Sequence, residues 1–96
     1  TWRVNLYFDN NSDETSKFSG YNFTFNSNGQ ISATNGSNSV SGTWSQGSNR
    51  FYINFGTTAV FSDLNDNWLL VEKTTASIKM KDDNPAKNEQ LNFVKL

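Results

Sequence analysis

The chain of 96 residues contains no cysteine, no histidine and a single proline. Without cysteine it has no disulfide framework, thiolate metal site or cysteine nucleophile. Without histidine it lacks the usual general base near neutral pH and the commonest zinc ligand. The 8 basic and 9 acidic residues give a formal net charge of −1, which offers no electrostatic footprint for nucleic acid. No apolar run approaches the ~20 residues that a membrane-spanning helix needs. We therefore expect no enzyme activity, no cofactor, no metal, no nucleic-acid partner and no transmembrane segment.

Short polar residues and aromatic rings make up much of what is there. Asn, Ser and Thr supply 36 residues and aromatics supply 14, in a chain with a mean hydropathy of −0.67. Thr, Tyr, Phe and Trp favour strands, whereas Asn, Ser and Gly favour turns. The composition predicts one all-β domain over residues 1–96.

Apolar and polar residues alternate along eight short segments. Trp2, Val4, Leu6 and Phe8 show the pattern most clearly, because period 2 indicates a strand with one buried face. The same pattern predicts further strands around 21–25, 31–33, 40–44, 51–55, 68–72, 78–80 and 91–93. Asn-Gly pairs at 28–29 and 35–36 are typical of hairpin turns. The spacing of Val60, Phe61 and Leu64 predicts one short helical turn near residues 58–64.

Eight short strands joined by tight turns favour an eight-stranded antiparallel up-and-down meander barrel, which leaves no exposed edge. A two-sheet sandwich is the competing arrangement. Strands this short enclose little volume, so we expect side chains to fill the barrel and leave at most a shallow pocket at its mouth. The predicted inward residues are Trp2, Val4, Leu6, Phe8, Tyr21, Phe23, Phe25, Ile31, Val40, Trp44, Phe51, Ile53, Phe55, Trp68, Leu70, Ile78, Met80, Leu91 and Phe93.

Several motifs occur in a familiar order along nearly the whole chain. These are the Trp2 strand, the stretch from Phe23 to Gly29, Gly42-Thr43-Trp44, the segment 64–68, and Leu91-Asn92-Phe93. In this the chain resembles the small lipocalin-like (calycin-type) lipoprotein domains of Bacteroidota. The resemblance implies a calyx-like barrel, export by a lipoprotein signal with a lipid anchor upstream of Thr1, and a location in the cell envelope or outside the cell. The role of such domains is mostly unknown.

We expect a monomeric, non-enzymatic binding module that takes a small apolar ligand at the barrel mouth. The candidate ligand residues are Trp2, Tyr21, Trp44 and Trp68. A carbohydrate-binding domain is one alternative, with Tyr7 and Tyr52 as exposed rings on the polar faces of their strands. An inhibitor of secreted proteases, plugging an active site with its barrel-end loops, is another.

Other acidic and basic groupings have plain surface interpretations. Asp63 and Asp66 lie three residues apart, which would place them on one helical face. The pair fits either the acid and base of a hydrolase or the solvated start of a helix. The side-chain oxygens of residues 9–14 and 63–67 have the spacing of the first ligands in a calcium-binding loop. Both segments lack the Gly and the Glu that such a loop has at later positions, so we interpret them as surface turns. The basic residues between Lys73 and Lys95 alternate with Asp82, Asp83 and Glu89, which is typical of a solvated mixed-charge face.

Overall fold

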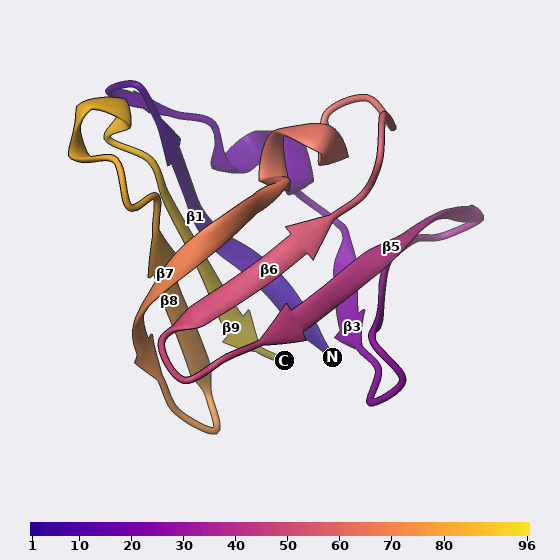
Figure 1. The fold of residues 1–96 in the computed structure, drawn as a ribbon. Helices are drawn as coiled ribbons and strands as arrows, with labels where there is room; N and C mark the ends of the chain where they lie inside the picture. Colours follow the sequence, from indigo (N-terminus) through magenta and orange to yellow (C-terminus); the bar gives the residue numbers. More distant parts are fainter.

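The computed structural model describes all 96 residues apart from the side chain of Pro85. The chain consists of nine strands and three short 3₁₀ turns (Figure 1). In order they are β1 (Trp2–Asp9), β2 (Ser12–Asp13), η1 (Thr15–Phe18), β3 (Asn22–Phe25), β4 (Gln30–Asn35), β5 (Asn38–Gln46), β6 (Arg50–Asn54), η2 (Phe61–Leu64), β7 (Asp66–Lys73), β8 (Ser77–Lys81), η3 (Pro85–Lys87) and β9 (Gln90–Lys95).

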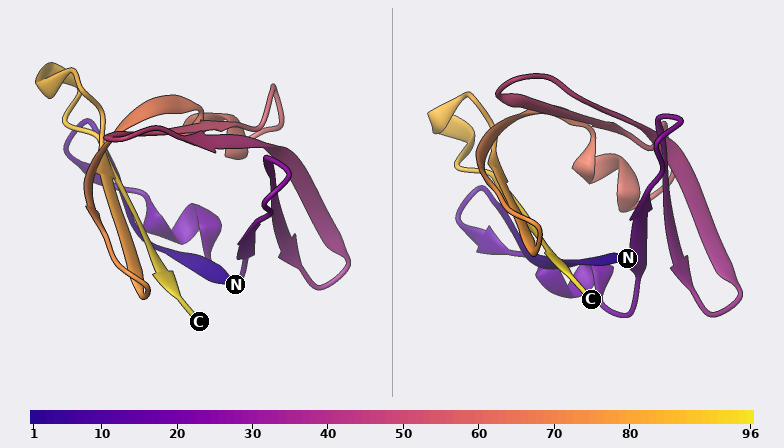
Figure 2. Two further views of the ribbon diagram at one scale, coloured as in Figure 1. Left: turned by 60° about the horizontal axis from the view of Figure 1, so that its bottom comes forward. Right: turned by 90° about the horizontal axis from the view of Figure 1, so that it is seen from below.

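Eight of the strands close into an antiparallel up-and-down barrel. The sheet order is β2-β1-β3-β4-β5-β6-β7-β8-β9, and β1 also pairs with β9 along its length. The join between β1 and β3 is short and consists of the pair Trp2 and Phe23. Seen from below, the strands form a ring (Figure 2). The predicted barrel is confirmed, and the two-residue β2 is an addition that folds back on the end of β1.

Turn chemistry sets several connections. Gly29 and Gly36 have positive φ angles of 88° and 59°, which the two predicted hairpins require. Asn10 and Asn11, also with positive φ, make a two-residue turn between β1 and β2, so this segment is the surface turn that we expected. The predicted helical turn is present as η2, which begins at Phe61 after Val60 with φ of 54°. Among the described residues no helix is long and apolar enough to span a bilayer.

Two β-bulges shift the inward pattern. In β1 the register to β9 slips between Val4 and Leu6, and in β7 the register to β8 slips between Leu70 and Glu72. An extra residue in one strand reverses which side chains face inward after it. Tyr7 is consequently 1% exposed, whereas Leu6 and Phe8 are only partly buried. The prediction that Leu6 and Phe8 point into the core, and Tyr7 out of it, is wrong for this reason.

Side chains fill the barrel, as predicted. Phe18 from η1 and Phe61 from η2 lie 5.6 Å apart at their ring centroids, and both pack on Phe23. The two turns lie together at the upper end of the barrel, and both termini lie at the lower end (Figure 1). We call these the closed end and the open end. The buried apolar side chains are Val4, Tyr7, Phe18, Phe23, Ile31, Ala33, Phe51, Ile53, Phe55, Phe61, Leu64, Trp68, Ile78, Met80, Leu91 and Phe93.

Candidate functional site

The four predicted ligand residues divide between the two ends of the barrel. Trp2 and Trp44 line one hollow at the open end. Tyr21 and Trp68 pack near the closed end, where Tyr21 contacts Phe61 and the Trp68 indole N–H donates to the Leu64 carbonyl. The structure therefore brings together half of the predicted set.

The hollow at the open end, which we call the mouth hollow, has a volume of about 140 Å³. Its walls are mostly rings and one aliphatic side chain, with a single cation and a single amide at the edge. It is lined by Trp2, Phe25, Trp44, Gln46, Phe51, Lys73 and Ile78. An apolar cavity of about 150 Å³ is large enough for one benzene ring. The mouth hollow thus has room for a single ring and not for a long acyl chain.

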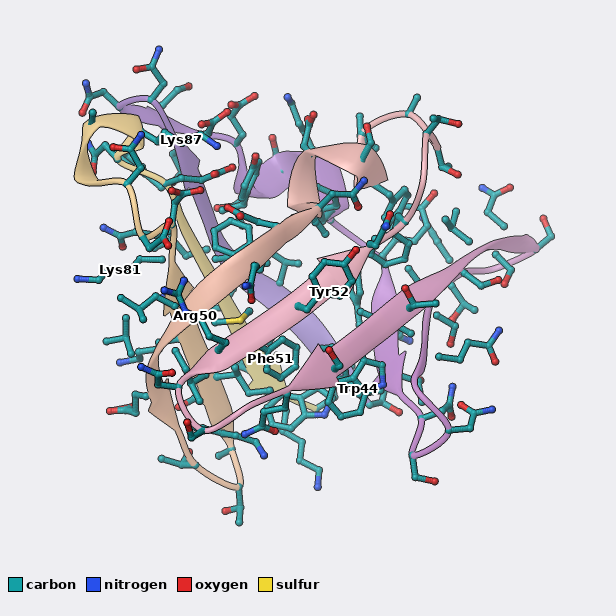
Figure 3. All side chains as sticks on the ribbon, viewed as in Figure 1. Trp44, Arg50, Phe51, Tyr52, Lys81 and Lys87 are labelled. Atoms are coloured by element: carbon teal, nitrogen blue, oxygen red, sulfur yellow. The ribbon has the colours of Figure 1, made fainter. Side chains whose placement is uncertain are left out.

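Its aromatic walls are held in place by the barrel. The Trp44 ring stacks on Phe51 with centroids 5.4 Å apart and an interplanar angle of 20°. The Trp44 indole N–H donates to the Asn26 carbonyl at 2.9 Å, which fixes the ring orientation. Phe25 meets Trp2 at 6.3 Å and Trp44 at 5.4 Å, both edge-on. Figure 3 shows Trp44 and Phe51 side by side near the lower end of β5 and β6. The walls are preorganised, so a ligand would meet little ordering cost.

A second, wider hollow adjoins the first and shares Trp2 and Lys73 with it. This outer hollow has a volume of about 470 Å³ and is lined by Trp2, Lys73, Thr74, Thr75 and Lys95. The Lys95 ammonium lies 6.0 Å from the centroid of the Trp2 ring. Lys73 donates to the side-chain carbonyl of Gln46 at 3.0 Å. The aromatic mouth is therefore edged by two cations.

Trp68 and Tyr21 do not line this mouth. Trp68 is fully buried beneath η2, and Tyr21 is half-buried beside an outer groove between β1 and β3 that Arg3 also lines. The prediction that all four rings surround one mouth is wrong. The Trp68 indole is turned toward η2, where it bonds the Leu64 carbonyl, and the Tyr21 ring packs on Phe61.

The two tyrosines of the carbohydrate hypothesis also lie in different places. Tyr52 is 40% exposed on the outer face of β6, and its hydroxyl accepts from the Asn54 amide at 3.0 Å (Figure 3). Tyr7 is buried, so the expectation of an exposed Tyr7 ring is wrong. The bulge after Val4 is the physical reason.

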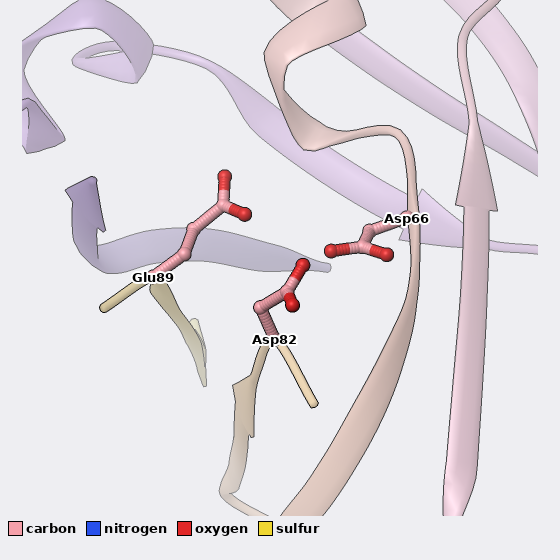
Figure 4. A group of neighbouring side chains, drawn as sticks. All are labelled: Asp66, Asp82 and Glu89. Carbon is pink, nitrogen blue, oxygen red and sulfur yellow. The ribbon is translucent and has the colours of Figure 1, made fainter. Parts of the chain in front are cut away.

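A cluster of carboxylates occupies the closed end (Figure 4). Asp66, Asp82 and Glu89 each place one carboxylate oxygen within 4.8 Å of the others. Asp82 and Glu89 are only 7% and 8% exposed. Tyr7 donates to Glu89 Oε2 at 3.0 Å, and the Lys87 ammonium lies 3.3 Å from Asp82 and 4.0 Å from Glu89. The carboxylate cluster is thus a buried polar network held together by one phenol and one cation.

Burial shifts the acidity of this network. Desolvation raises the pKa of Glu89 to about 7, against the smaller lowering effect of the Tyr7 hydrogen bond. Desolvation and the neighbouring Asp82 raise the pKa of Asp66, whereas the pKa of Asp82 is lowered, chiefly by its contact with Asp66. Asp66 Oδ2 is buried and has no hydrogen-bond partner among the described residues. A proton shared between Asp66 and Asp82 would satisfy that oxygen, and the opposite directions of their pKa shifts fit such sharing between close carboxylates.

Three carboxylate oxygens so close together form a donor set of the kind that hard divalent cations take. Lys87 already supplies one positive charge to two of the three groups. The raised pKa values of Glu89 and Asp66 add protons near neutral pH, which reduces the negative charge further. Lys87 and these raised pKa values therefore reduce the negative charge of the cluster, whose side chains form a largely buried polar network.

Sequence reasoning missed this cluster, because Asp82 and Glu89 were assigned to a solvated mixed-charge face. That assignment is wrong, although a signal was present. Asp82 follows the inward residues Ile78 and Met80 at the same spacing of two, and Glu89 precedes the inward Leu91 and Phe93. Asp66 likewise stands two residues before Trp68. If the inward-facing pattern of each of these strands is extended by two residues, it includes an acidic residue in each case, and the three acids fall at one end of the barrel.

The remaining acidic candidates separate in the structure. Asp63 is exposed in η2 and lies 3.5 Å from the Lys17 ammonium, whereas Asp66 begins β7 and joins the carboxylate cluster. The proposed shared helical face of Asp63 and Asp66 does not form, since η2 ends at Leu64. Asn65 instead ties η2 to the end of β6, accepting from the Phe55 N–H at 2.6 Å and donating to the Gly56 carbonyl.

The site that the fold builds most completely is the open mouth with its preorganised rings and flanking cations. Its residues come from β1, β3, β5, β6, β7 and β8, so it exists only when the barrel is closed. Comparison of the chain with protein-family models, with curated proteins and with solved structures finds no significant match.

Proposed function

We propose that this chain is a non-enzymatic, lipocalin-like binding module that holds a small apolar ring in its mouth hollow. The observation that carries the proposal is the aromatic hollow of about 140 Å³ at the end of an otherwise filled barrel. Half-buried indole rings that are already fixed in place offer apolar area to a ligand at little entropic cost. The small volume narrows the ligand to one ring or a short branched chain.

The three tryptophans give this proposal an internal control. Trp2 and Trp44 line the mouth hollow, whereas the Trp68 ring, on the strand beside Phe51, is turned toward η2 and does not line it. Titration with toluene, followed by the indole N–H signals in ¹H–¹⁵N NMR spectra, is expected to shift the Trp2 and Trp44 signals and leave the Trp68 signal in place. A dissociation constant on the order of 0.1–1 mM is reasonable for a ligand of this size.

Two substitutions make the test specific. Trp2→Ala removes one wall of the mouth hollow, and we expect it to weaken toluene binding about tenfold or more. Tyr52→Ala removes an exposed ring from the outer face of β6 and serves as the matched control, with unchanged binding. Toluene that shifts none of the three indole signals at millimolar concentration, or shifts Trp68 most, overturns the proposal.

The location in the cell envelope or outside the cell stays part of this proposal and rests on the resemblance to lipoprotein domains. Fractionation of the native host cells, with detection of the protein by antibody, tests it. Recovery in the cytoplasmic fraction alone would contradict the proposed location without touching the binding proposal.

A further inference from the structure

We infer that the ligand of the mouth hollow is a small acid: an apolar ring that carries a carboxylate or similar anion one or two bonds away. This inference rests on the proposed function, and it names the ligand class. It is drawn from the two cations that edge the mouth and from the continuity of the two hollows.

The two hollows form a path from apolar to cationic surroundings. The mouth hollow is walled by Trp2, Phe25, Trp44, Phe51 and Ile78, and the outer hollow by Trp2, two threonines and two lysines. Because Trp2 and Lys73 line both hollows, a ring bound against Trp2 in the mouth hollow has Lys73 beside it, and Lys95 lies across the Trp2 ring in the outer hollow. No aspartate or glutamate is among the residues that line either hollow.

The charges of these two lysines are not matched by carboxylates. Lys17, Arg50, Lys79 and Lys87 each make an ion pair, but within the described part of the chain neither Lys73 nor Lys95 makes one. Lys73 is instead held by the neutral Gln46 amide, and Lys95 lies over the Trp2 ring. An anionic substituent would gain a charge-assisted hydrogen bond from each without breaking an existing ion pair.

The position of Lys73 also limits the distance between the ring and the acid group of a preferred ligand. Its ammonium lies at the edge of the mouth hollow, where it donates to Gln46 Oε1 at 3.0 Å. A ligand acid must therefore be close to its ring, since a long spacer would carry the anion past Lys73 into open solvent. Phenylacetate has the required size, and 2-phenylethylammonium has a similar shape with the opposite charge.

Three probes and three variants test the inference. Toluene, phenylacetate and 2-phenylethylammonium are titrated against the wild-type chain, with the Trp2 and Trp44 indole signals as the readout. We expect phenylacetate to bind about 5–30-fold more tightly than toluene, and 2-phenylethylammonium to bind more weakly than toluene. Raising NaCl from 20 to 300 mM should reduce the advantage of phenylacetate while toluene binding stays constant.

The variants locate the effect. Lys73→Gln and Lys95→Gln are each expected to weaken phenylacetate binding about two- to fivefold relative to toluene binding measured in the same variant. Lys81→Gln makes the same change of charge on the outer face near Gln90 and is the matched control. All three positions are exposed, so these variants should fold normally.

The outcomes separate the two proposals. If toluene binds at the mouth but phenylacetate binds no more tightly, or Lys81→Gln weakens phenylacetate binding as much as Lys73→Gln does, the acid inference is overturned and the proposed function stands. If neither toluene nor phenylacetate shifts the Trp2 and Trp44 signals, the proposed function falls and the inference with it.

Discussion

The same rows of inward-facing side chains run from one end of this barrel to the other, but the residues at the two ends differ: one end carries aromatic rings and the other carries carboxylates. At the open end the rows finish in half-buried rings, namely Trp2, Phe25 and Trp44, beside solvated lysines. At the closed end three rows finish in Asp66, Asp82 and Glu89, and Tyr7 bonds Glu89 while its ring packs on Phe18 of η1. One end leaves apolar surface in contact with water, and the other removes charge from water.

The difference between the two ends predicts different roles for their residues in ligand binding and in folding stability. A half-exposed ring contributes less to folding than a buried one, because less of its apolar area leaves water on folding. The same exposed area is available to a ligand. Burying carboxylates has the reverse effect, since their desolvation is costly and makes the folded state sensitive to pH. We therefore expect mutations at the open end to change binding and mutations at the closed end to change stability.

The largest expected effect comes from the aromatic group at the closed end. Phe61 is 2% exposed. Its ring packs against those of Phe18, Tyr21 and Phe55, with distances between ring centroids of 5.0–5.6 Å. Phe61→Ala should lower the free energy of unfolding by about 3–5 kcal/mol, measured by urea denaturation, because it leaves a cavity among rings that cannot collapse easily. Trp2→Ala at the open end should cost only about 1–2 kcal/mol. Equal costs at the two ends would contradict the distinction.

The barrel itself could be predicted from sequence, and the reasons are local. Period-2 alternation around Phe23, Phe51 and Phe93 marks strands, and glycines with positive φ near 29 and 36 mark their hairpins. What the pattern could not provide was the position of the bulges. A single extra residue near Asn5 turned Tyr7 inward, and nothing in the composition of β1 distinguishes that strand from a regular one.

The sites were harder to predict because they depend on which strand ends meet. Trp2 and Trp44 were expected at one mouth and do share it, but the Trp68 and Tyr21 rings are turned toward η2, where they meet Leu64 and Phe61. The carboxylate cluster joins Asp66 to residues 16 and 23 positions away, across three strand ends. Such proximity follows from closure of the barrel and not from spacing along the chain.

The second prediction concerns pH and the closed end. Burial raises the pKa of Glu89 from 4.5 to about 7, so the folded state binds a proton that the unfolded chain releases between these values. The resulting stabilisation is fully present below about pH 4 and is lost as pH rises through 7. The free energy of unfolding should thus fall by about 3 kcal/mol between pH 4.5 and pH 8, and the raised pKa of Asp66 acts in the same direction. Urea denaturation at half-unit pH intervals measures this.

Glu89→Gln is the control for that pH dependence. The amide has a similar shape and can still accept the Tyr7 hydrogen bond, but it does not titrate. Most of the slope between pH 5 and pH 8 should disappear in this variant. A wild-type stability that rises over that interval, or a slope unchanged in Glu89→Gln, would show that the cluster does not hold its protons as described.

The smallest expected effect tests the link between Tyr7 and the cluster. The Tyr7 hydroxyl donates to Glu89 Oε2 at 3.0 Å, and burial together with the nearby carboxylate raises its pKa above the ordinary range, so it remains a donor at every pH of interest. Tyr7→Phe should cost about 1 kcal/mol at pH 5, where Glu89 is protonated, and about 2 kcal/mol at pH 8.5, where the lost bond was to a charged acceptor. Because that hydrogen bond lowers the pKa of Glu89, its removal should also move the midpoint of the pH dependence upward. Tyr52→Phe, on the outer face, should change stability by the same small amount at both pH values. The hydroxyl also lies 3.2 Å from the Asp63 carbonyl, so a Tyr7→Phe cost that is independent of pH would mean that it bonds chiefly to this uncharged acceptor and does not govern the charge of the closed end.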